Sequence, residues 1–347
     1  MKSLPKIWFR ADGNVLMGLG HLVRSSALAS MLNDDFDIHF VCIELDDTLK
    51  KDLINDGFSV NRINSEDEFI GMISSGDLVV LDGYQFGTSY QKQLKSKQIG
   101  LVCIDDIMDK EFHADLIINQ APDANPENYR TPSYTEFALG IEYCLLRKPF
   151  LDAINFRNSS EMKIGTSIIE NTVFICFGGS DAQNLTMSTY KLVKELNLSS
   201  KIILVTGSSY EHRETLENLL QHDSSTEHYH HINAGKMAEL MSASAIKIVP
   251  SSGILYEALA TGGIVISGYY TDNQIPNYSA FLGMKAIMGA EKFDDQSLRN
   301  AISQIYDFNP VQNIIDGKSP DRFKKVFLKL HRKTIESVGI SSHQTAN

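Results

Sequence analysis

The chain is poor in the features that mark secreted, membrane-spanning and fibrous proteins. Its 347 residues include 4 cysteines and 1 tryptophan. No stretch approaches the roughly 18 uninterrupted apolar residues of a transmembrane helix. The N-terminus leads directly into an apolar run, without the basic region and apolar core of a signal peptide. We therefore expect a cytoplasmic protein with no membrane partner.

The cysteines and histidines form no metal-binding pattern. The cysteines are widely spaced without a C-x-x-C pair, and three lie in apolar runs as small hydrophobic residues: Cys42, Cys103 and Cys176. His228, His230 and His231 stand close together, but the alternation of a strand explains their spacing equally well. We predict no metal and no cofactor.

An excess of positive charge is also missing. The formal net charge is −11, which argues against nucleic acid or an anionic membrane as a partner. The apolar fraction of 43% and the charged fraction of 22% are those of a globular protein. The sequence leaves the oligomeric state open, a monomer included.

Strand-like runs alternate with helical patterns along the whole chain, which predicts parallel sheets with crossover helices. An irregular stretch over about 147–170 interrupts the alternation, which restarts at 172–177. We expect an α/β protein of two Rossmann-like domains, residues 1–150 and 171–318, followed by a basic helix and tail in 319–347. Because ligands bind at the carboxyl ends of parallel strands, a cleft between the domains should hold the site.

The first informative motif follows the first strand. Arg10-Ala11-Asp12 ends the apolar run, and Gly18-Leu19-Gly20-His21 leads into a helix. Glycines at such a turn let a ligand approach the backbone, and a histidine there is well placed to move a proton. A histidine that only caps the helix fits the same pattern. Downstream, Asp82-Gly83-Tyr84 ends another strand, and its tyrosine can bind substrate or pack.

The second half contains three strand-to-helix loops rich in small and polar residues. They are Phe177-Gly178-Gly179-Ser180-Asp181, Pro250-Ser251-Ser252-Gly253 with Glu257 one turn later, and Thr271-Asp272-Asn273-Gln274. Helix N-termini with glycine and serine are suited to bind phosphate. A carboxylate on such a helix can accept hydrogen bonds from ribose hydroxyls. Neither an ATP-type P-loop nor a full G-x-G-x-x-G is present. Tight turns and helix caps are the structural alternatives.

The ordered set of motifs resembles the UDP-sugar hydrolases of pseudaminic acid biosynthesis. The resemblance runs from residue 7 to about 275 and also includes Arg24, Asn184-Leu185-Thr186 and Met237-Ala238-Glu239-Leu240-Met241. It implies the two-domain glycosyltransferase-B fold. It also implies inverting cleavage of the C1–O bond of UDP-2,4-diacetamido-2,4,6-trideoxy-β-L-altropyranose, with release of UDP.

The resemblance also suggests residue roles. His21 is the candidate general base, with Asp12 to orient it and Tyr84 to hold water or a sugar oxygen. The sugar is expected at Arg10, Gly18, Gly20, Asn273 and Gln274. UDP is expected at Gly178, Gly179, Ser180, Ile232, Met237, Ser251, Ser252, Gly253 and Glu257.

Other functions fit the same motifs. A glycosyltransferase of this fold would use an acceptor hydroxyl in place of water, although no amphipathic basic patch for a lipid acceptor precedes residue 150. A hydrolase of another UDP-2,4-diacetamido sugar, a UDP-sugar epimerase and a non-catalytic nucleotide-sugar sensor are the further alternatives.

Overall fold

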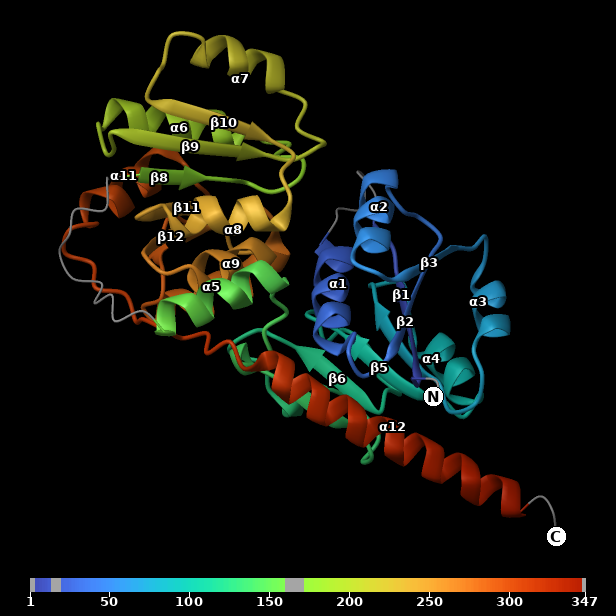
Figure 1. Ribbon diagram of the computed structural model, residues 1–347. Helices are drawn as coiled ribbons and strands as arrows, with labels where there is room; N and C mark the ends of the chain where they lie inside the picture. Colours follow the sequence, from blue (N-terminus) through green and yellow to red (C-terminus); the bar gives the residue numbers. More distant parts are fainter. Residues whose placement is uncertain (1–3, 14–19, 160–171, 345–347) are drawn as a thin grey trace. The chain divides into compact units, whose positions relative to one another are not determined.

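The computed structural model describes residues 4–13, 20–159 and 172–344 (Figure 1). The chain divides into two compact units. Unit 1 is residues 1–147 with 318–347, and unit 2 is residues 148–317. The long C-terminal helix α12 (Ser319–Gln344) therefore belongs to unit 1, although the chain reaches it through unit 2.

Unit 1 is built on a seven-stranded parallel sheet with the order β3-β2-β1-β4-β5-β6-β7. Its strands are β1 (Lys6–Ala11), β2 (Asp37–Cys42), β3 (Ser59–Arg62), β4 (Leu78–Asp82), β5 (Gly100–Ile104), β6 (Leu116–Asn119) and β7 (Glu136–Leu139). Its other helices are α1 (Gly20–Leu32), α2 (Asp47–Asn55), α3 (Glu66–Met72), α4 (Thr88–Lys95), η1 (Pro126–Asn128) and η2 (Ile141–Tyr143). The strand order reverses between β1 and β4, where open α/β sheets bind ligands.

Apolar residues on both faces of this sheet hold the helices in place. Alternate side chains of a strand point to opposite faces. Phe9 of β1 is buried in one core cluster with Leu28 of α1 and Phe327 of α12. Trp8 lies in a second cluster, with Phe69 of α3. Helix α12 is thus part of the core that fixes α1, the helix on which His21 stands.

Unit 2 repeats the plan with a six-stranded parallel sheet, in the order β10-β9-β8-β11-β12-β13. The strands are β8 (Thr172–Ile175), β9 (Lys201–Thr206), β10 (Thr226–His230), β11 (Ile246–Pro250), β12 (Ile264–Gly268) and β13 (Met288–Gly289). The helices are α5 (Lys148–Ser159), α6 (Leu185–Glu195), α7 (Arg213–Leu220), α8 (Ala234–Ser242), α9 (Gly253–Ala260), η3 (Asp272–Gln274), α10 (Ile275–Gly283) and α11 (Asp295–Ser303). The order reverses between β8 and β11.

Two local features differ from the sequence prediction. Residues 148–159, expected to be irregular, form α5, because Phe150, Leu151 and Ile154 share one buried face and Pro149 is tolerated in the first turn. The strands β3, β7 and β13 were not predicted, and all three are short and stand at sheet edges. In the described part of the chain, no helix is long and apolar enough to cross a bilayer.

Candidate functional site

The first candidate site lies in unit 1, at the carboxyl ends of β1, β4 and β5. His21 is the second residue of α1. The predicted residue Gly18 lies outside the described residues, while Gly20 is exposed at the start of the helix. No heavy atom lies within 4 Å of a Cβ placed on Gly20, so packing does not require glycine there.

His21 is hydrogen-bonded to a buried carboxylate that ends β4. Its Nδ1 lies 2.7 Å from Asp82 Oδ1. Ser25 donates its hydroxyl to Asp82 Oδ2 at 3.0 Å, and Arg24 approaches the same carboxylate with Nη2 at 2.6 Å from Oδ1. The three helix residues reach one acceptor because positions i, i+3 and i+4 share a helix face.

The charge of Asp82 determines which nitrogen of His21 can act as a base. Burial raises the pKa of this carboxyl, but Arg24 and the hydrogen bond from His21 outweigh burial and hold the pKa below its ordinary value. An ionised carboxylate only accepts hydrogen bonds, so His21 Nδ1 must carry the proton. The lone pair of the neutral imidazole is then on Nε2, which is the arrangement of a general base.

Asp12 was expected to orient His21, and this pairing was wrong. Asp12 Oδ1 accepts hydrogen bonds from the backbone N–H groups of Ile43 and Glu44, and it is 2.8 Å from Arg10 Nη1. The fully buried Arg10 also pairs with Glu66 of α3 at 2.7 Å. Alternation in β1 directs Arg10 to the face covered by α3 and α4, away from α1. In the structure both residues hold unit 1 together, and their hydrogen bonds and ion pairs go to other residues than His21.

Tyr84 lies beside His21, as the motif suggested. Its side chain is 41% exposed, and its ring meets the imidazole edge to face at 4.8 Å. Lys110 Nζ donates to the Tyr84 carbonyl at 2.9 Å. The next residue, Gln85, donates to Asp12 Oδ2 at 3.2 Å. Asp12 therefore contributes to the site indirectly, by anchoring the loop that carries Tyr84.

Sequence reasoning missed the partner of His21. The motif that contains Asp82 predicts no role for this carboxylate, and the resemblance that includes Arg24 suggests none for the arginine. Two signals were available: Asp82 is a charged residue that directly follows a buried apolar run, and Arg24 stands one helical turn after His21. Neither signal reveals that β4 is the neighbour of β1 in the sheet.

The second candidate site lies in unit 2, in the loops after β8, β11 and β12. Gly178 has a φ of +87°, a backbone conformation that favours glycine. The exposed Gly179 packs closely against the backbone of Gly207. A Cβ placed on Gly207 would lie 2.3 Å from the carbonyl oxygen of Gly179. Ser180 is exposed beside them. Gly179 and Ser180 therefore leave the surface of this loop open to solvent.

The helix that follows this loop is already capped. Asp181 accepts hydrogen bonds from the N–H groups of Leu185 and Thr186, both at 2.8 Å. Its carboxylate occupies the position at the start of α6 where a phosphate would bind. The N-terminus of α6 is therefore unsuited to an anion.

Helix α9 begins without such a cap. Its N-cap residue, Ser252, makes no side-chain hydrogen bond to the helix, and Gly253 is exposed. The neighbouring Ser251 differs from the prediction, since it is fully buried with its hydroxyl 2.9 Å from that of Ser267. The first N–H groups of α9 can therefore receive an anion, with Ser252 rather than Ser251 beside it.

The remaining predicted residues surround these loops. Glu257 lies one turn into α9 and is 6% exposed. Ile232 follows β10, and Met237 is half-buried in α8. In η3, Gln274 Oε1 accepts the N–H of Tyr270 at 3.1 Å, and Asn273 Oδ1 accepts the Thr271 hydroxyl at 2.7 Å. Both amides thus shape the loop after β12.

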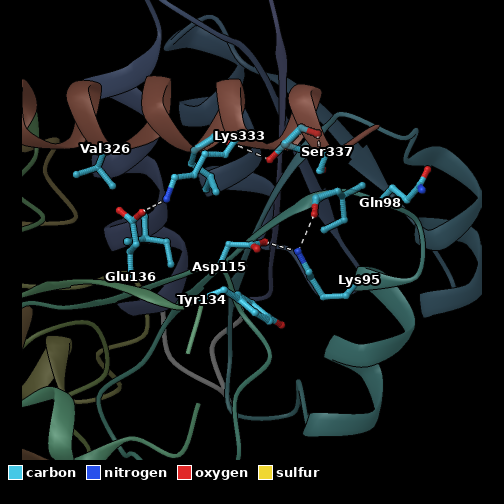
Figure 2. Close-up of a pocket in the computed structure, with 12 residues that line it drawn as sticks. Lys95, Gln98, Asp115, Tyr134, Glu136, Val326, Lys333 and Ser337 are labelled. Atoms are coloured by element: carbon cyan, nitrogen blue, oxygen red, sulfur yellow. Dashed lines mark hydrogen bonds and ion pairs between the residues drawn. The ribbon is translucent and has the colours of Figure 1, made fainter. Parts of the chain in front are cut away.

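A cavity of about 440 Å³ lies elsewhere in unit 1, between α12 and the amino ends of β5 to β7 (Figure 2). Its charged walls are already paired. Lys95 is 2.5 Å from Asp115, and Glu136 is bound by Lys329 at 2.8 Å and by Lys333. The cavity lies at the amino ends of the strands, whereas His21 lies at their carboxyl ends. The charged side chains named above that line the cavity are all paired, so they are not available to a charged ligand.

The histidine cluster has a structural explanation. His228 Nε2 and His230 Nδ1 both lie near the Thr206 hydroxyl, at 2.9 and 3.2 Å. Burial lowers the pKa of both imidazoles. Among the described residues, no three His, Cys, Asp or Glu side chains gather as metal ligands.

Two curated proteins are similar to this chain in sequence, and no family model matches it. The chain is 26% identical over 276 residues to UDP-2,4-diacetamido-2,4,6-trideoxy-beta-L-altropyranose hydrolase of Campylobacter jejuni, a match that covers 78% of this chain and 93% of that protein. It is 25% identical over 287 residues to an uncharacterized protein of Methanocaldococcus jannaschii. That match covers 80% of this chain but 58% of the archaeal protein. The resemblance predicted from the motifs is confirmed by the first match.

Solved structures share the fold over nearly the whole chain. Acinetobacter baumannii MurG superposes with a TM-score of 0.56 at 12% identity, covering 92% of this chain and 99% of that chain. The S. aureus MnaA–UDP complex superposes with a TM-score of 0.59 at 12% identity, covering 94% and 98%. The predicted α/β fold of two parallel-sheet domains, of the glycosyltransferase-B type, is confirmed. At these identities the likeness extends to the fold alone.

Proposed function

We propose that the protein hydrolyses UDP-2,4-diacetamido-2,4,6-trideoxy-β-L-altropyranose, releasing UDP and the free sugar with inversion at C1. An enzyme acting on UDP-sugars agrees with the hydrolase similarity and with a fold shared with the MnaA–UDP complex. The observation that carries the proposal is the 2.7 Å contact between His21 Nδ1 and Asp82, because it leaves Nε2 as a proton acceptor.

In the proposed reaction the water oxygen attacks C1 and His21 Nε2 accepts a proton from that water. The C1–O bond breaks, and its electron pair remains on the diphosphate oxygen of UDP. The extra proton later passes from His21 to solvent. General-base catalysis of this kind is worth about 10²–10⁴-fold in rate.

We assign UDP to unit 2. The diphosphate would accept hydrogen bonds from the first N–H groups of α9, beside Ser252 and Gly253, where the N-cap residue Ser252 makes no side-chain hydrogen bond to the helix. The helix dipole would stabilise the charge on the leaving group. Glu257 would hold the ribose, Ile232 and Met237 would flank the uracil, and Asn273 and Gln274 would face the sugar.

The test is to incubate the purified protein with this UDP-sugar in H₂¹⁸O without acceptor. NMR would follow UDP release and the anomer formed first, and mass spectrometry would locate the ¹⁸O. Hydrolysis with C1–O cleavage places ¹⁸O in the sugar and none in UDP. His21→Asn should lower turnover at least about 100-fold, and the matched control His113→Asn, in the same unit, should not. Label in the nucleotide would contradict the proposed bond cleavage.

A glycosyltransferase is the second candidate, because the same base could deprotonate an acceptor hydroxyl on this fold. UDP that binds but is not released without an acceptor would favour it.

A further inference from the structure

Arg24 contacts three titratable side chains of unit 1, which are His21, Asp82 and Asp106. Its Nε lies 2.8 Å from Asp82 Oδ2, and its Nη2 lies 2.6 Å from Asp82 Oδ1. The same Nη2 is 3.1 Å from His21 Nδ1, and Nη1 is 2.8 Å from Asp106 Oδ2. Arg24 is thus clamped between a buried and a half-exposed carboxylate, with its side chain 16% exposed.

Three of these atoms form a triangle in which the short contact between His21 and Asp82 favours one proton arrangement over the other. Asp82 Oδ1 accepts from Arg24 Nη2 and lies 2.7 Å from His21 Nδ1. If Nδ1 carried no proton, it could accept from Arg24 Nη2 at 3.1 Å, but its lone pair would face the lone pairs of an ionised oxygen at the shorter distance of 2.7 Å. With the proton on Nδ1, the oxygen accepts from both donors.

Without Arg24 the direction of the hydrogen bond between Asp82 and His21 Nδ1 can reverse. Asp82 is 1% exposed, and a buried carboxylate without a cationic partner favours its protonated form. A protonated Asp82 can donate to Nδ1. The imidazole proton would then lie on Nε2, which could no longer accept a proton from water.

We propose that Arg24 is a positioning residue that, by keeping Asp82 ionised, fixes the Nδ1–H tautomer of His21. Asp106 holds the far end of the guanidinium, so that the Nε–Nη2 edge faces Asp82. The inference rests on the proposed function only for the consequence in catalysis. The tautomer itself is a property of unit 1.

The experiment uses the full-length protein labelled with ¹⁵N-histidine. Nitrogen chemical shifts distinguish protonated from unprotonated imidazole nitrogens, and the His21 signals are assigned by their loss in His21→Asn. In the wild type at pH 8, Nδ1 should be protonated and Nε2 unprotonated. Arg24→Gln should move the population to the Nε2–H tautomer, and Arg24→Lys, which keeps the charge, should restore much of the original state.

Kinetics with the UDP-sugar provide the second readout. Arg24→Gln should lower kcat by about 10²-fold with KM changed less than about threefold, since the residue acts on the base and not on binding. Asp106→Asn should lower kcat by less than about tenfold, because a half-exposed ion pair is weak. The matched control is Asp109→Asn, a charge removal in the same loop, and it should change neither readout.

The outcomes distinguish the proposed role of Arg24 from the proposed hydrolase function. An unchanged His21 tautomer in a folded Arg24→Gln protein overturns the inference, whatever the activity. If that variant does not fold, as judged by Trp8 fluorescence, an Arg24→Lys protein that keeps the tautomer but loses kcat as fully as His21→Asn overturns it as well. A tautomer that shifts as expected in a protein that hydrolyses no UDP-sugar supports the inference and contradicts the proposed function.

Discussion

Lys247 is buried in the sheet of unit 2, and its replacement by methionine is expected to stabilise that unit. The side chain is 0% exposed in β11, and Nζ donates to the carbonyl oxygen of Gly262 rather than to a carboxylate. Burial lowers the pKa of the amine from 10.5 to about 7, and the nearby Arg157 adds to the effect. A protonated amine at this position therefore destabilises the folded state.

The magnitude follows from the two pKa values. The difference between 10.5 and about 7, at 1.36 kcal/mol per pH unit, corresponds to a penalty of about 5 kcal/mol. The folded state has the lower pKa, so the unfolded chain binds more protons between pH 7 and 10.5. Stability therefore rises with pH through this window, and the penalty is fully present below about pH 7.

Lys247→Met removes the penalty but also the hydrogen bond to Gly262, which is worth about 1–3 kcal/mol. The net gain in the free energy of unfolding should be about 2–4 kcal/mol at pH 7. It should shrink as pH rises, reach zero between about pH 8 and 10, and become a small loss above that pH.

Urea denaturation at pH 7, 8 and 9 would measure the gain. Far-UV circular dichroism reports on both units, whereas Trp8, the one tryptophan of the chain, lies in unit 1 and serves as an internal control. Lys191→Met, at an exposed position of α6, is the matched substitution. If the free energies of unfolding of the wild type and of Lys247→Met change with pH in parallel, the reasoning is refuted.

Four further substitutions test the proposed sites. His21→Asn should lower turnover at least about 100-fold while UDP affinity, measured by calorimetry, stays within about threefold, because the base does not bind the nucleotide. Glu257→Ala should weaken UDP binding about tenfold or more through the loss of a charged acceptor for ribose, and unchanged affinity would remove Glu257 from that role. Gly253→Asp should weaken UDP binding about tenfold or more, since a carboxylate at the start of α9 repels diphosphate. Asp181→Ala, by contrast, should lower stability by about 1 kcal/mol through the lost cap of α6 and leave UDP affinity unchanged.

The alternation of apolar runs and helical patterns was enough to predict two parallel-sheet domains. The central strands are continuous apolar runs because both their faces are buried, so they are visible in the sequence. The edge strand β3, with the sequence Ser-Val-Asn-Arg, is half exposed and lacks that signal. Helix α5 was missed because Pro149 and the Asn-Ser end of the segment resemble a loop.

The choice between two similar glycine-containing loops could not be made from sequence. Both lead from a strand to a helix, and both have serine. The structure separates them, because Asp181 adopts a φ of +42° and turns its carboxylate onto the first N–H groups of α6. Ser252 makes no corresponding bond to α9.

The sequence by itself determined the buried central strands and the position of His21 at the start of a helix, because these depend on side-chain periodicity and on backbone preferences over a few neighbouring residues. Tertiary structure decided the partners. Asp82 is 61 residues from His21, and it replaces the nearer Asp12 because β4 pairs with β1 and its carboxyl end lies under α1. Likewise, α12 joins unit 1 because Phe323 and Phe327 complete the core of that unit. Such contacts depend on the order of strands in the sheet, which no local pattern encodes.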